Sequence, residues 1–598
     1  MPEVKALSLW NILLFLRASG RQEISEGQSG MIAWRRPLEV NMRIFGRALS
    51  EGSYIIESGG ARTAYTVEKR KTGFKVTGKA QGRLGRIEVF RGRAPREFLL
   101  NNWQSWGPFQ KMRPGERHPG IKEVMRTYSQ YVFTPVPEVF SKGLVSDYFI
   151  AWPGQLAGFL SSRLAHPYFT IEGDELAGYL EYFDTLFDEP IPLEPLIFLQ
   201  NGFDDAGSGG PLPVTPESLV EGLLEEYADL AATENSSRVP AQNPVGWSSW
   251  YQYFANLQWE DIEKNLRLAR GVFPFAVFQV DDGFEKDIGD WLTAKDGFRP
   301  LPELARLISG QGFAAGIWTA PFSAAETSDL FQKHPDWMVQ EAGAPKECYR
   351  NWGKKIYALD TTRPDVKEWL WEIFSALRRM GFSYFKVDFL FAAAMPGERV
   401  DKGTPIQAYR EGMRTIREAV GDGFILGCGA PLLPSAGFVE GMRVGEDTAL
   451  DWDARRGAFQ GPNAYYALKN SIMRSFLHRR LWLNDPDCLL LRSRDISLTP
   501  NERELYALAA GALDNMIFES DDLALVDDQG RGLLRKAVAL QGGRVNIRGL
   551  MGPDIYLIRS QGDRAGEVRL IANLSDRSNE YEAVEVPPRS ARLIRGPA

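Results

Sequence analysis

Cysteine and histidine are scarce in this chain. Three cysteines occur, Cys348, Cys428 and Cys488, and only four histidines, among 598 residues. A sparse, odd set of cysteines argues against a disulfide framework and favours a reducing compartment, so we expect a cytoplasmic protein. Because the histidines are dispersed and no Cys-x-x-Cys pair occurs, the sequence predicts no metal site and no cofactor.

Long hydrophobic runs and clusters of basic residues are also missing. The apolar stretch at residues 6–16 is too short to span a bilayer. It could form the core of a signal peptide, but Glu3 weakens the positive start and no clear cleavage site follows Arg17. The net charge is −7 with scattered basic residues. We therefore expect neither nucleic acid nor a membrane as a partner, and we interpret residues 1–41 as an extension before the fold.

Changes in the hydrophobic pattern divide the remaining chain into three parts. Short strand-like runs broken by glycine, proline and charge predict a β-sandwich or barrel, followed by a loop at 202–215 and a helix at 216–231. Strand-like runs then alternate with amphipathic helices, which is typical of βα units with a parallel sheet. The end of the chain is again β-like. The predicted domains are 42–235 with the trailing helix, 236–541 and 542–598.

The middle part contains eight good strand candidates, which is the number in a closed (β/α)8 TIM barrel. A ninth run, 356–359, is better placed as a minor strand in a long loop. In such a barrel the loops after the strands form the active face. The eight predicted strands are 245–250, 276–281, 314–318, 384–388, 424–428, 442–445, 481–484 and 516–519.

Two of these strands end by presenting an aspartate. Asp388 ends the fourth strand and Asp447 follows the sixth. Two carboxylates on one scaffold can act as nucleophile and general acid/base, as retaining glycosidases require, so the sequence predicts a glycoside hydrolase. Lys386 faces the same way as Asp388 in a strand, and we expect it to hold that carboxylate ionised. The alternative is a structural ion pair.

Further polar residues lie at other strand ends. Asp281 and Asp282 suit a clamp for neighbouring hydroxyl groups, although a helix cap or a cation site would use the same residues. Arg443 could hold a substrate hydroxyl or orient Asp447, or form a structural ion pair. Glu446 is a second candidate for the acid/base, because a neighbouring like charge raises a carboxyl pKa.

Aromatic and small residues at the strand ends could complete a sugar pocket. Trp250 and Tyr251 end the first strand and Trp318 ends the third. Core packing would explain any one of them, but apolar sugar faces also lie flat on such rings. Cys428 and Gly429 follow the fifth strand, where glycine permits close approach of a ligand to the backbone.

Eight strings of the chain, in this order, resemble the bacterial α-galactosidases (melibiases), a family that also contains raffinose synthases and α-N-acetylgalactosaminidases. The resemblance runs from about Met42 to the end of the chain. The strings are GWSSWY at 246–251, QVDDG at 279–283, GIWTAPF at 316–322, HPDW at 334–337, KVDF at 386–389, GCG at 427–429, Arg443 with Asp447, and NDPD at 484–487.

This resemblance implies a multidomain α/β protein: a central (β/α)8 barrel flanked by an N-terminal β-supersandwich and a small C-terminal antiparallel β-domain. It implies a retaining double displacement with Asp388 as nucleophile and Asp447 as acid/base, about 5–5.5 Å apart. The implied galactose contacts are Asp281 and Asp282 on O4 and O6, Lys386 on O3/O4, Arg443 near O2, Trp318 on the sugar face, Trp103 from an N-terminal loop (NWQSW, 102–106), and Trp250, Tyr251, Cys428 and Gly429 around them.

Several functions stay open at this point. The leading one is an exo-acting α-galactosidase on melibiose- or raffinose-type sugars. A galactosyltransferase would use the same residues with a sugar as acceptor. An α-N-acetylgalactosaminidase would need room for an acetamido group beside Cys428 and Arg443. A non-catalytic galactoside-binding protein would be expected if either aspartate were replaced, and both are present. The preferred aglycone and the assembly into a homo-oligomer are not predicted.

Overall fold

The computed structural model describes residues 42–58, 60–116, 134–140, 143–201, 218–452, 462–562 and 566–595. The predicted extension at 1–41, the predicted loop at 202–215 and the first two residues of the predicted helix lie outside the described residues. None of the described helices is long and apolar enough to cross a membrane.

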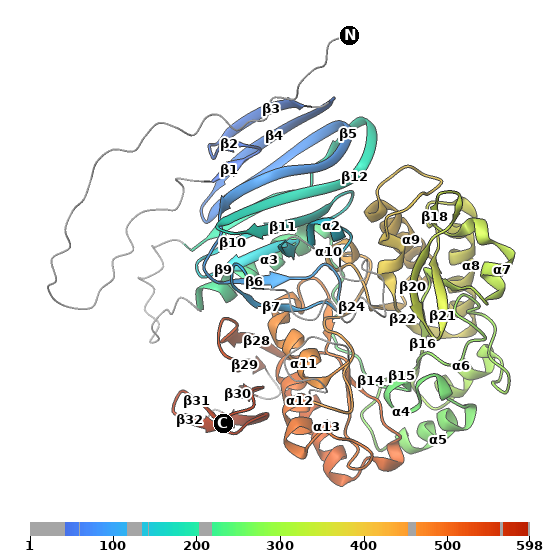
Figure 1. The fold of residues 1–598 in the computed structure, drawn as a ribbon. Helices are drawn as coiled ribbons and strands as arrows, with labels where there is room; N and C mark the ends of the chain where they lie inside the picture. Colours follow the sequence, from blue (N-terminus) through green and yellow to red (C-terminus); the bar gives the residue numbers. More distant parts are fainter. Residues whose placement is uncertain are drawn as a thin grey trace. The chain divides into compact units, whose positions relative to one another are not determined.

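The described N-terminal part is built on an antiparallel sheet of 13 strands, drawn in blue and teal in Figure 1. Its main path is β7-β6-β9-β10-β13-β5-β12-β11-β8, and β1 to β4 join it through β5. The strands are β1 (Arg43–Ile44), β2 (Arg47–Ala48), β3 (Gly52–Ser58), β4 (Ala61–Arg70), β5 (Gly73–Arg93), β6 (Phe98–Asn101), β7 (Phe109–Met112), β8 (Leu144–Asp147), β9 (Phe149–Trp152), β10 (Gln155–Phe159), β11 (His166–Glu172), β12 (Glu175–Pro192) and β13 (Leu196–Gln200).

Two helices accompany this sheet, α2 (Pro137–Phe140) and α3 (Ser218–Asn235). The longer helix, α3, confirms the predicted trailing helix and extends it by four residues at its end, to Asn235. Leu223, Leu224 and Tyr227 of α3 are buried because their spacing puts them on one face of the helix. The Tyr227 hydroxyl donates to the carbonyl of Phe159 at 2.7 Å, which ties the helix to strand β10.

The middle part forms a curled parallel sheet that fits a (β/α)8 barrel. Its order is β25-β24-β23-β22-β16-β15-β14-β27-β26. The strands are β14 (Val245–Ser248), β15 (Val277–Val280), β16 (Ala314–Thr319), β22 (Phe382–Val387), β23 (Phe424–Gly427), β24 (Gly441–Arg443), β25 (Leu483–Asp485), β26 (Cys488–Leu489) and β27 (Ile517–Glu519). All eight predicted strands are confirmed, with ends shifted by a few residues.

The sheet closes through a broken seventh strand. Strand β25 pairs with β24, whereas β26, which begins three residues after β25 ends, pairs with β27. The backbone N–H of Met516 also donates to the carbonyl of Asn484 at 2.9 Å, which joins the residue before β27 to β25. The two short strands therefore together occupy one of the eight barrel positions.

Most helices of this part lie around the outside of the parallel strands (Figure 1). Their ends carry ordinary start and stop signals: α12 begins with a capping box between Thr499 and Glu502, and α8 is followed by Gly381, which caps it with φ of 110°. The helices are α4 (Trp250–Tyr253), α5 (Trp259–Ala269), α6 (Leu301–Gly310), α7 (Asp329–Lys333), α8 (Pro364–Met380), α9 (Pro405–Val420), α10 (Leu432–Ser435), α11 (Ala464–Met473), α12 (Pro500–Ala512) and α13 (Asp528–Leu540), with 3-10 turns η4 (Phe254–Asn256), η5 (Pro335–Trp337), η6 (Leu390–Ala394), η7 (Ser475–Leu477) and η8 (Leu523–Leu525).

The ninth predicted strand is indeed a minor strand in a loop. It is β21 (Lys354–Ala358), which forms a small antiparallel sheet with β17 (Ser323–Ala325) and β20 (Glu347–Asn351) between β16 and α8. A second pair, β18 (Gln340–Glu341) with β19 (Ala344–Pro345), lies in the same loop. The turn between β20 and β21 brings Trp352 to the barrel mouth, as described below.

The C-terminal part is antiparallel. Its sheet has the order β28-β29-β30-β33, and β31 pairs with β32. The strands are β28 (Gly543–Arg548), β29 (Ile555–Gly562), β30 (Gly566–Asn573), β31 (Asn579–Tyr581), β32 (Val584–Val586) and β33 (Ser590–Arg595). The strand content agrees with the sequence analysis, while the domain boundaries stay predictions.

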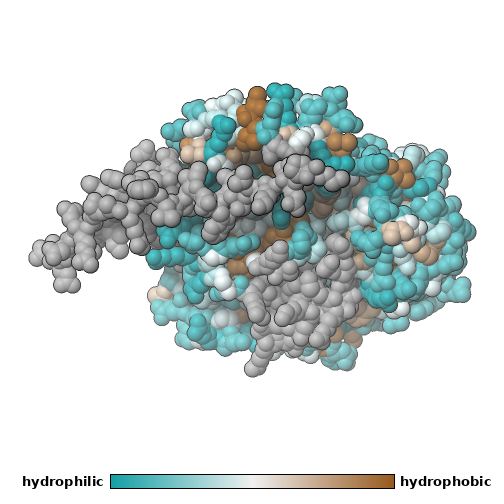
Figure 2. All heavy atoms as spheres, turned by 45° about the horizontal axis from the view of Figure 1, so that its top comes forward, coloured by the Kyte–Doolittle hydropathy of each residue, from teal (hydrophilic) through white to brown (hydrophobic). Residues whose placement is uncertain are grey.

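Apolar side chains on the described surface are scattered. The face in Figure 2 is largely hydrophilic with small separate hydrophobic areas. Ile55, Trp371 and Val400 are 53%, 48% and 61% exposed and lie on different elements. Single exposed apolar residues are ordinary on a folded protein. The polar residues buried at the ends of the barrel strands are the less ordinary feature, and they form the candidate site.

Candidate active site

The predicted site residues lie at the carboxyl ends of the barrel strands. Asp281 follows β15, Asp388 follows β22, and Asp447 lies four residues after the end of β24. Parallel strands deliver their ends to the same rim of a barrel, so residues far apart in sequence meet there. The first two carboxylates are 1% and 6% exposed, which is unusual for aspartate unless its oxygens have partners.

Asp388 is held by neighbouring N–H groups. Its Oδ2 accepts from the Trp318 indole Nε1 at 3.1 Å, and its Oδ1 accepts from the backbone N–H of Phe389 at 2.7 Å. Phe389 itself adopts φ of 51°, a left-handed conformation that is rare for a bulky residue. The chain therefore turns sharply after Asp388, and the carboxylate is fixed in orientation.

Lys386 forms its ion pair with Asp281 and not with Asp388, although the charge of Asp388 still acts on it. The Lys386 Nζ lies 2.9 Å from Oδ2 of Asp281, which is its ion-pair partner. The two-residue alternation applies within a strand, but Asp388 lies beyond the end of β22, where the backbone turns. Asp281 also accepts from the side chains of Ser248 and Gln279. Lys386 thus bridges the second and fourth barrel strands.

Asp282 meets two residues that sequence reasoning missed. Its Oδ2 accepts from the indole Nε1 of Trp352 at 2.8 Å, and its carboxyl group hydrogen-bonds to that of Glu285. Burial raises the pKa of Asp282. Trp352 lies at the turn between β20 and β21, where no sequence pattern indicates a site. Glu285 lies two residues after the DDG string, and this proximity could have indicated that it belongs to the site.

Arg443 is the centre of a carboxylate network. It is 2% exposed, and its guanidinium reaches three aspartates: Nη1 is 2.9 Å from Oδ1 of Asp447, Nε 3.3 Å from Oδ2 of Asp485, and Nη2 2.7 Å from Oδ1 of Asp487. The Tyr251 hydroxyl donates to Oδ2 of Asp487. The arrangement uses the fork of N–H donors that only arginine offers.

Asp447 has the electrostatics of a general acid. Burial, the largest cause, raises its pKa to about 6, with Arg443 opposing the rise and the charges of Asp487 and Asp388 adding to it. Its side chain is still 36% exposed, so it can exchange protons with water. Glu446, the second candidate, is only 7% exposed, and its Oε1 has no hydrogen-bond partner in the described part of the chain. Of the two carboxyl groups, Asp447 is therefore the better candidate for a general acid.

Trp250 and Tyr251, predicted to end the first strand, both lie in helix α4 after strand β14. Tyr251 is 4% exposed and reaches Asp487 as described. The ring of Trp250, the first residue of α4, packs edge-on against Phe254 with centroids 5.2 Å apart. Trp250 is half-buried, and its predicted sugar contact stays a prediction.

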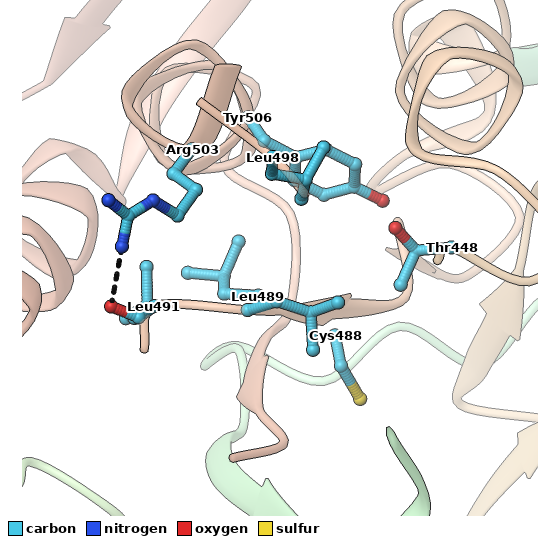
Figure 3. A pocket seen from close by; sticks show the side chains of 8 residues that line it. Thr448, Cys488, Leu489, Leu491, Leu498, Arg503 and Tyr506 are labelled. Atoms are coloured by element: carbon cyan, nitrogen blue, oxygen red, sulfur yellow. Dashed lines mark hydrogen bonds between the residues drawn. The ribbon is translucent and has the colours of Figure 1, made fainter. Parts of the chain in front are cut away.

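Behind the network lies a very small cavity of about 10 Å3. Figure 3 shows the hydroxyl groups of Thr448 and Tyr506 pointing toward one another at its edge, with Leu489 and Leu498 lining it. A cavity of this size has room for one water molecule at most. The cavity is therefore too small to be a ligand pocket.

The loop at 102–106 crosses to the barrel, but its two tryptophans differ. Trp103 is 0% exposed, so its predicted sugar contact would require the side chain to move. Trp106 is half-buried, and its Nε1 donates to the Sγ of Cys428 at 3.4 Å. A Cβ added to Gly429, whose φ is +52°, would lie 2.9 Å from the Trp106 ring. Trp106 is therefore the tryptophan of this loop that contacts Cys428 and Gly429, the residues that follow the fifth barrel strand.

A buried arginine fixes this loop to the barrel. Arg474 is 0% exposed and donates to the carbonyls of Ser105 and Val444, both at 2.9 Å, and to Oδ1 of Asn101. Burial lowers its pKa to about 9. The backbone N–H of Ser105 also donates to the carbonyl of Ala430 at 2.9 Å. These hydrogen bonds therefore hold the loop in place at the mouth of the barrel.

We expect Arg443→Met to lower the free energy of unfolding by about 3–5 kcal/mol, because it leaves buried carboxylates without their cation. Urea unfolding measured by circular dichroism checks the change. Arg350→Met is the control, since Arg350 forms an ion pair with Glu347 in which its side chain is 62% exposed. The control is expected to change stability by less than about 1 kcal/mol. Equal losses in both variants would contradict a structural role of the network.

Comparisons with known proteins agree with this architecture. The family model "Alpha-galactosidase, N-terminal" matches residues 66–200, and the model "Melibiase" matches residues 239–407. The α-galactosidase AgaA of Geobacillus stearothermophilus is 26% identical over 200 residues, which are 30% of this chain and 26% of AgaA. The chain thus matches about a quarter of the length of this curated relative.

Solved structures cover more of the chain. The α-galactosidase TtGalA of Thermus thermophilus, in complex with p-nitrophenyl α-D-galactopyranoside, is 28% identical with a TM-score of 0.66, over 85% of this chain and 98% of that one. A crystal structure of AgaA from G. stearothermophilus, 13% identical, has a TM-score of 0.57 over 90% and 79% of the two chains and shares the fold. The chain belongs to the bacterial α-galactosidase (melibiase) family.

Proposed function

We propose that the protein is a retaining exo-α-galactosidase that removes terminal α-linked galactose from melibiose- and raffinose-type oligosaccharides. The observation that carries the proposal is the pair Asp388 and Asp447 at one rim of the barrel, close enough that the charge of Asp388 contributes to the raised pKa of Asp447. The p-nitrophenyl α-galactoside bound in the similar TtGalA structure supports galactose as the sugar.

In the first step Asp388 attacks the anomeric carbon of galactose. The bond from its carboxylate oxygen forms as the glycosidic C–O bond breaks, and Asp447 gives its proton to the departing oxygen. The Trp318 N–H holds the Asp388 carboxylate in a fixed orientation, so that little reorganisation precedes the attack. Retention requires the two carboxyl groups to be about 5–5.5 Å apart, a spacing that stays a prediction.

In the second step Asp447 acts as a base. It takes a proton from water, whose oxygen attacks the anomeric carbon, and the bond to Asp388 breaks. Its raised pKa of about 6 suits both roles, because the group can change its charge near neutral pH. Asp281, Asp282, Lys386 and Arg443 would bind the sugar hydroxyls meanwhile, as the family resemblance implies.

The space around Cys428 favours galactose over N-acetylgalactosamine. An acetamido group would need room beside Cys428 and Arg443, and Trp106 fills the side of that space next to Gly429. An α-N-acetylgalactosaminidase is therefore the weaker alternative. A galactosyltransferase stays an alternative with the same residues, because it differs only in the acceptor that attacks the intermediate.

We also propose the domain division that accompanies this function in the family. Residues 1–41 would be an extension, 42–235 an N-terminal β-supersandwich with its trailing helix, 236–541 the catalytic barrel and 542–598 a C-terminal β-domain. A cytoplasmic location would fit the three cysteines, each of which is free and buried.

The proposal is tested by the hydrolysis of p-nitrophenyl α-D-galactoside, with the N-acetylgalactosaminide as the comparison. We expect kcat/KM on the galactoside to exceed that on the N-acetylgalactosaminide by at least about 100-fold, since a misfitting substituent costs several kcal/mol in a filled pocket. The anomer of the released sugar, followed by NMR, is expected to be α. A β product would contradict retention, and transfer to sucrose faster than hydrolysis would indicate the transferase.

A further inference from the structure

Asp282 and Glu285 form a hydrogen bond between their two carboxyl groups. Both are buried, at 4% and 8% exposed. The side chains contact each other across a turn in which Gly283 has φ of +108°. A carboxylate can only accept hydrogen bonds, so a bond between two such groups requires one of them to carry a proton.

The surroundings assign that proton to Glu285. The N–H of the Trp352 indole donates to Asp282, and the charge of Lys386 also favours ionised Asp282. Glu285 accepts with Oε2 from the backbone N–H groups of Gly283 and Phe284, both at 3.1 Å, which leaves Oε1 as the oxygen to carry the proton. Burial and the charge of Asp282 raise the pKa of Glu285 well above its usual range.

We propose that Glu285 is a positioning residue, a protonated carboxylic acid that donates a hydrogen bond to Asp282 and fixes that carboxylate to accept hydrogen bonds from sugar hydroxyls. This inference rests on the proposed function and adds to it. Asp281 and Asp282 then differ in how they are held: Asp281 by the cation of Lys386, and Asp282 by two donors without full charge, the Trp352 indole and the Glu285 acid.

The charges facing the pair determine when the proton is lost. They are Asp281 and Lys386, which form an ion pair with each other, and Lys295, whose Nζ donates to the carbonyl of Ala255 at 3.1 Å. Asp261 acts on Lys295 in turn. Loss of the proton would put a second negative charge on the pair, and the two carboxylates would repel each other. Galactose affinity is therefore expected to fall as the pH rises into the alkaline range.

Two substitutions distinguish the hydrogen bond that Glu285 donates from the packing of its side chain. Glu285→Gln keeps the size and an N–H donor but cannot lose a proton, whereas Glu285→Met keeps only the size. We expect the Kd of galactose, measured by titration calorimetry at neutral pH, to stay within about threefold in Glu285→Gln and to rise roughly 10–100-fold in Glu285→Met, as for loss of a hydrogen bond to a charged group. The alkaline loss of affinity should be absent from Glu285→Gln.

Infrared spectroscopy reads the proton directly. The difference spectrum between wild type and Glu285→Gln at neutral pH should contain the C=O stretch of one carboxylic acid. Absence of that band, or equal loss of affinity in both variants, would overturn the inference. If Glu285→Met does not fold, the inference is tested by the affinity and pH dependence of Glu285→Gln and by the infrared band. If the wild type binds galactose with this pattern but cleaves no α-galactoside, the proposed hydrolysis fails and the positioning role stands.

Discussion

Asp388→Gly is expected to lower kcat on aryl α-galactosides by at least about 10⁴-fold, because the residue that forms the covalent bond to the sugar is removed. The two groups that hold Asp388 cannot replace it, since Trp318 and the Phe389 backbone contribute only N–H donors at this position. KM should change much less than kcat. Initial rates over a range of substrate concentrations measure both.

Azide should restore activity to Asp388→Gly and identify the residue's role. The small anion fits the space left by the carboxylate and attacks the anomeric carbon from the same face, so the product should be β-galactosyl azide. Circular dichroism shows whether the variant is folded, and Asp296→Gly, at an exposed position, is the matched control. An active Asp388→Gly enzyme without azide would remove Asp388 from the mechanism.

Asp447→Ala is expected to lower kcat/KM about 10²–10⁴-fold on raffinose, whose leaving group needs a proton, and far less on an aryl galactoside with an acidic phenol. The pH profile adds a second test. The general acid must be protonated, and its pKa is raised to about 6, so the wild-type kcat/KM should fall as the pH rises through about 6. The alanine variant should lack this fall.

Glu446→Gln is the control that separates the two neighbouring carboxyl groups. Glu446 is buried and pairs with no cation in the described residues, so its substitution should leave the alkaline fall in place. If the glutamine variant lost the fall and Asp447→Ala kept it, the roles would be reversed. Azide should give α-galactosyl azide with Asp447→Ala, the opposite anomer to that from Asp388→Gly, because it then attacks the covalent intermediate.

The barrel strands could be predicted because each is a short apolar run that ends in polar residues. The same pattern located Asp388 and Asp447, since strand ends meet at one rim. The partner of Lys386 could not be predicted in this way, because the chain leaves the strand geometry at Phe389. The break in the seventh strand lies at Pro486 and Asp487, and it has no signature beyond the string NDPD.

The loops were the least predictable part. Trp352 lies in a hairpin turn inserted into a long loop, and its contact with Asp282 depends on how β20 and β21 fold back. Trp103 and Trp106 are equivalent in the string NWQSW, yet only the second reaches Cys428. Contacts between segments that are distant in sequence determine where these tryptophan side chains lie. Neither the hydrophobic periodicity nor the spacing of residues in the sequence predicts such contacts.

The position of Arg474 limits how the chain can be divided into fragments or recombined in chimeras. Its charge is fully buried, and the oxygens that satisfy it come from both the N-terminal loop and the barrel. A fragment starting near residue 236 would contain the cation without the carbonyl of Ser105 or the side chain of Asn101. Any chimera that exchanges the N-terminal part must therefore supply matching acceptors for Arg474.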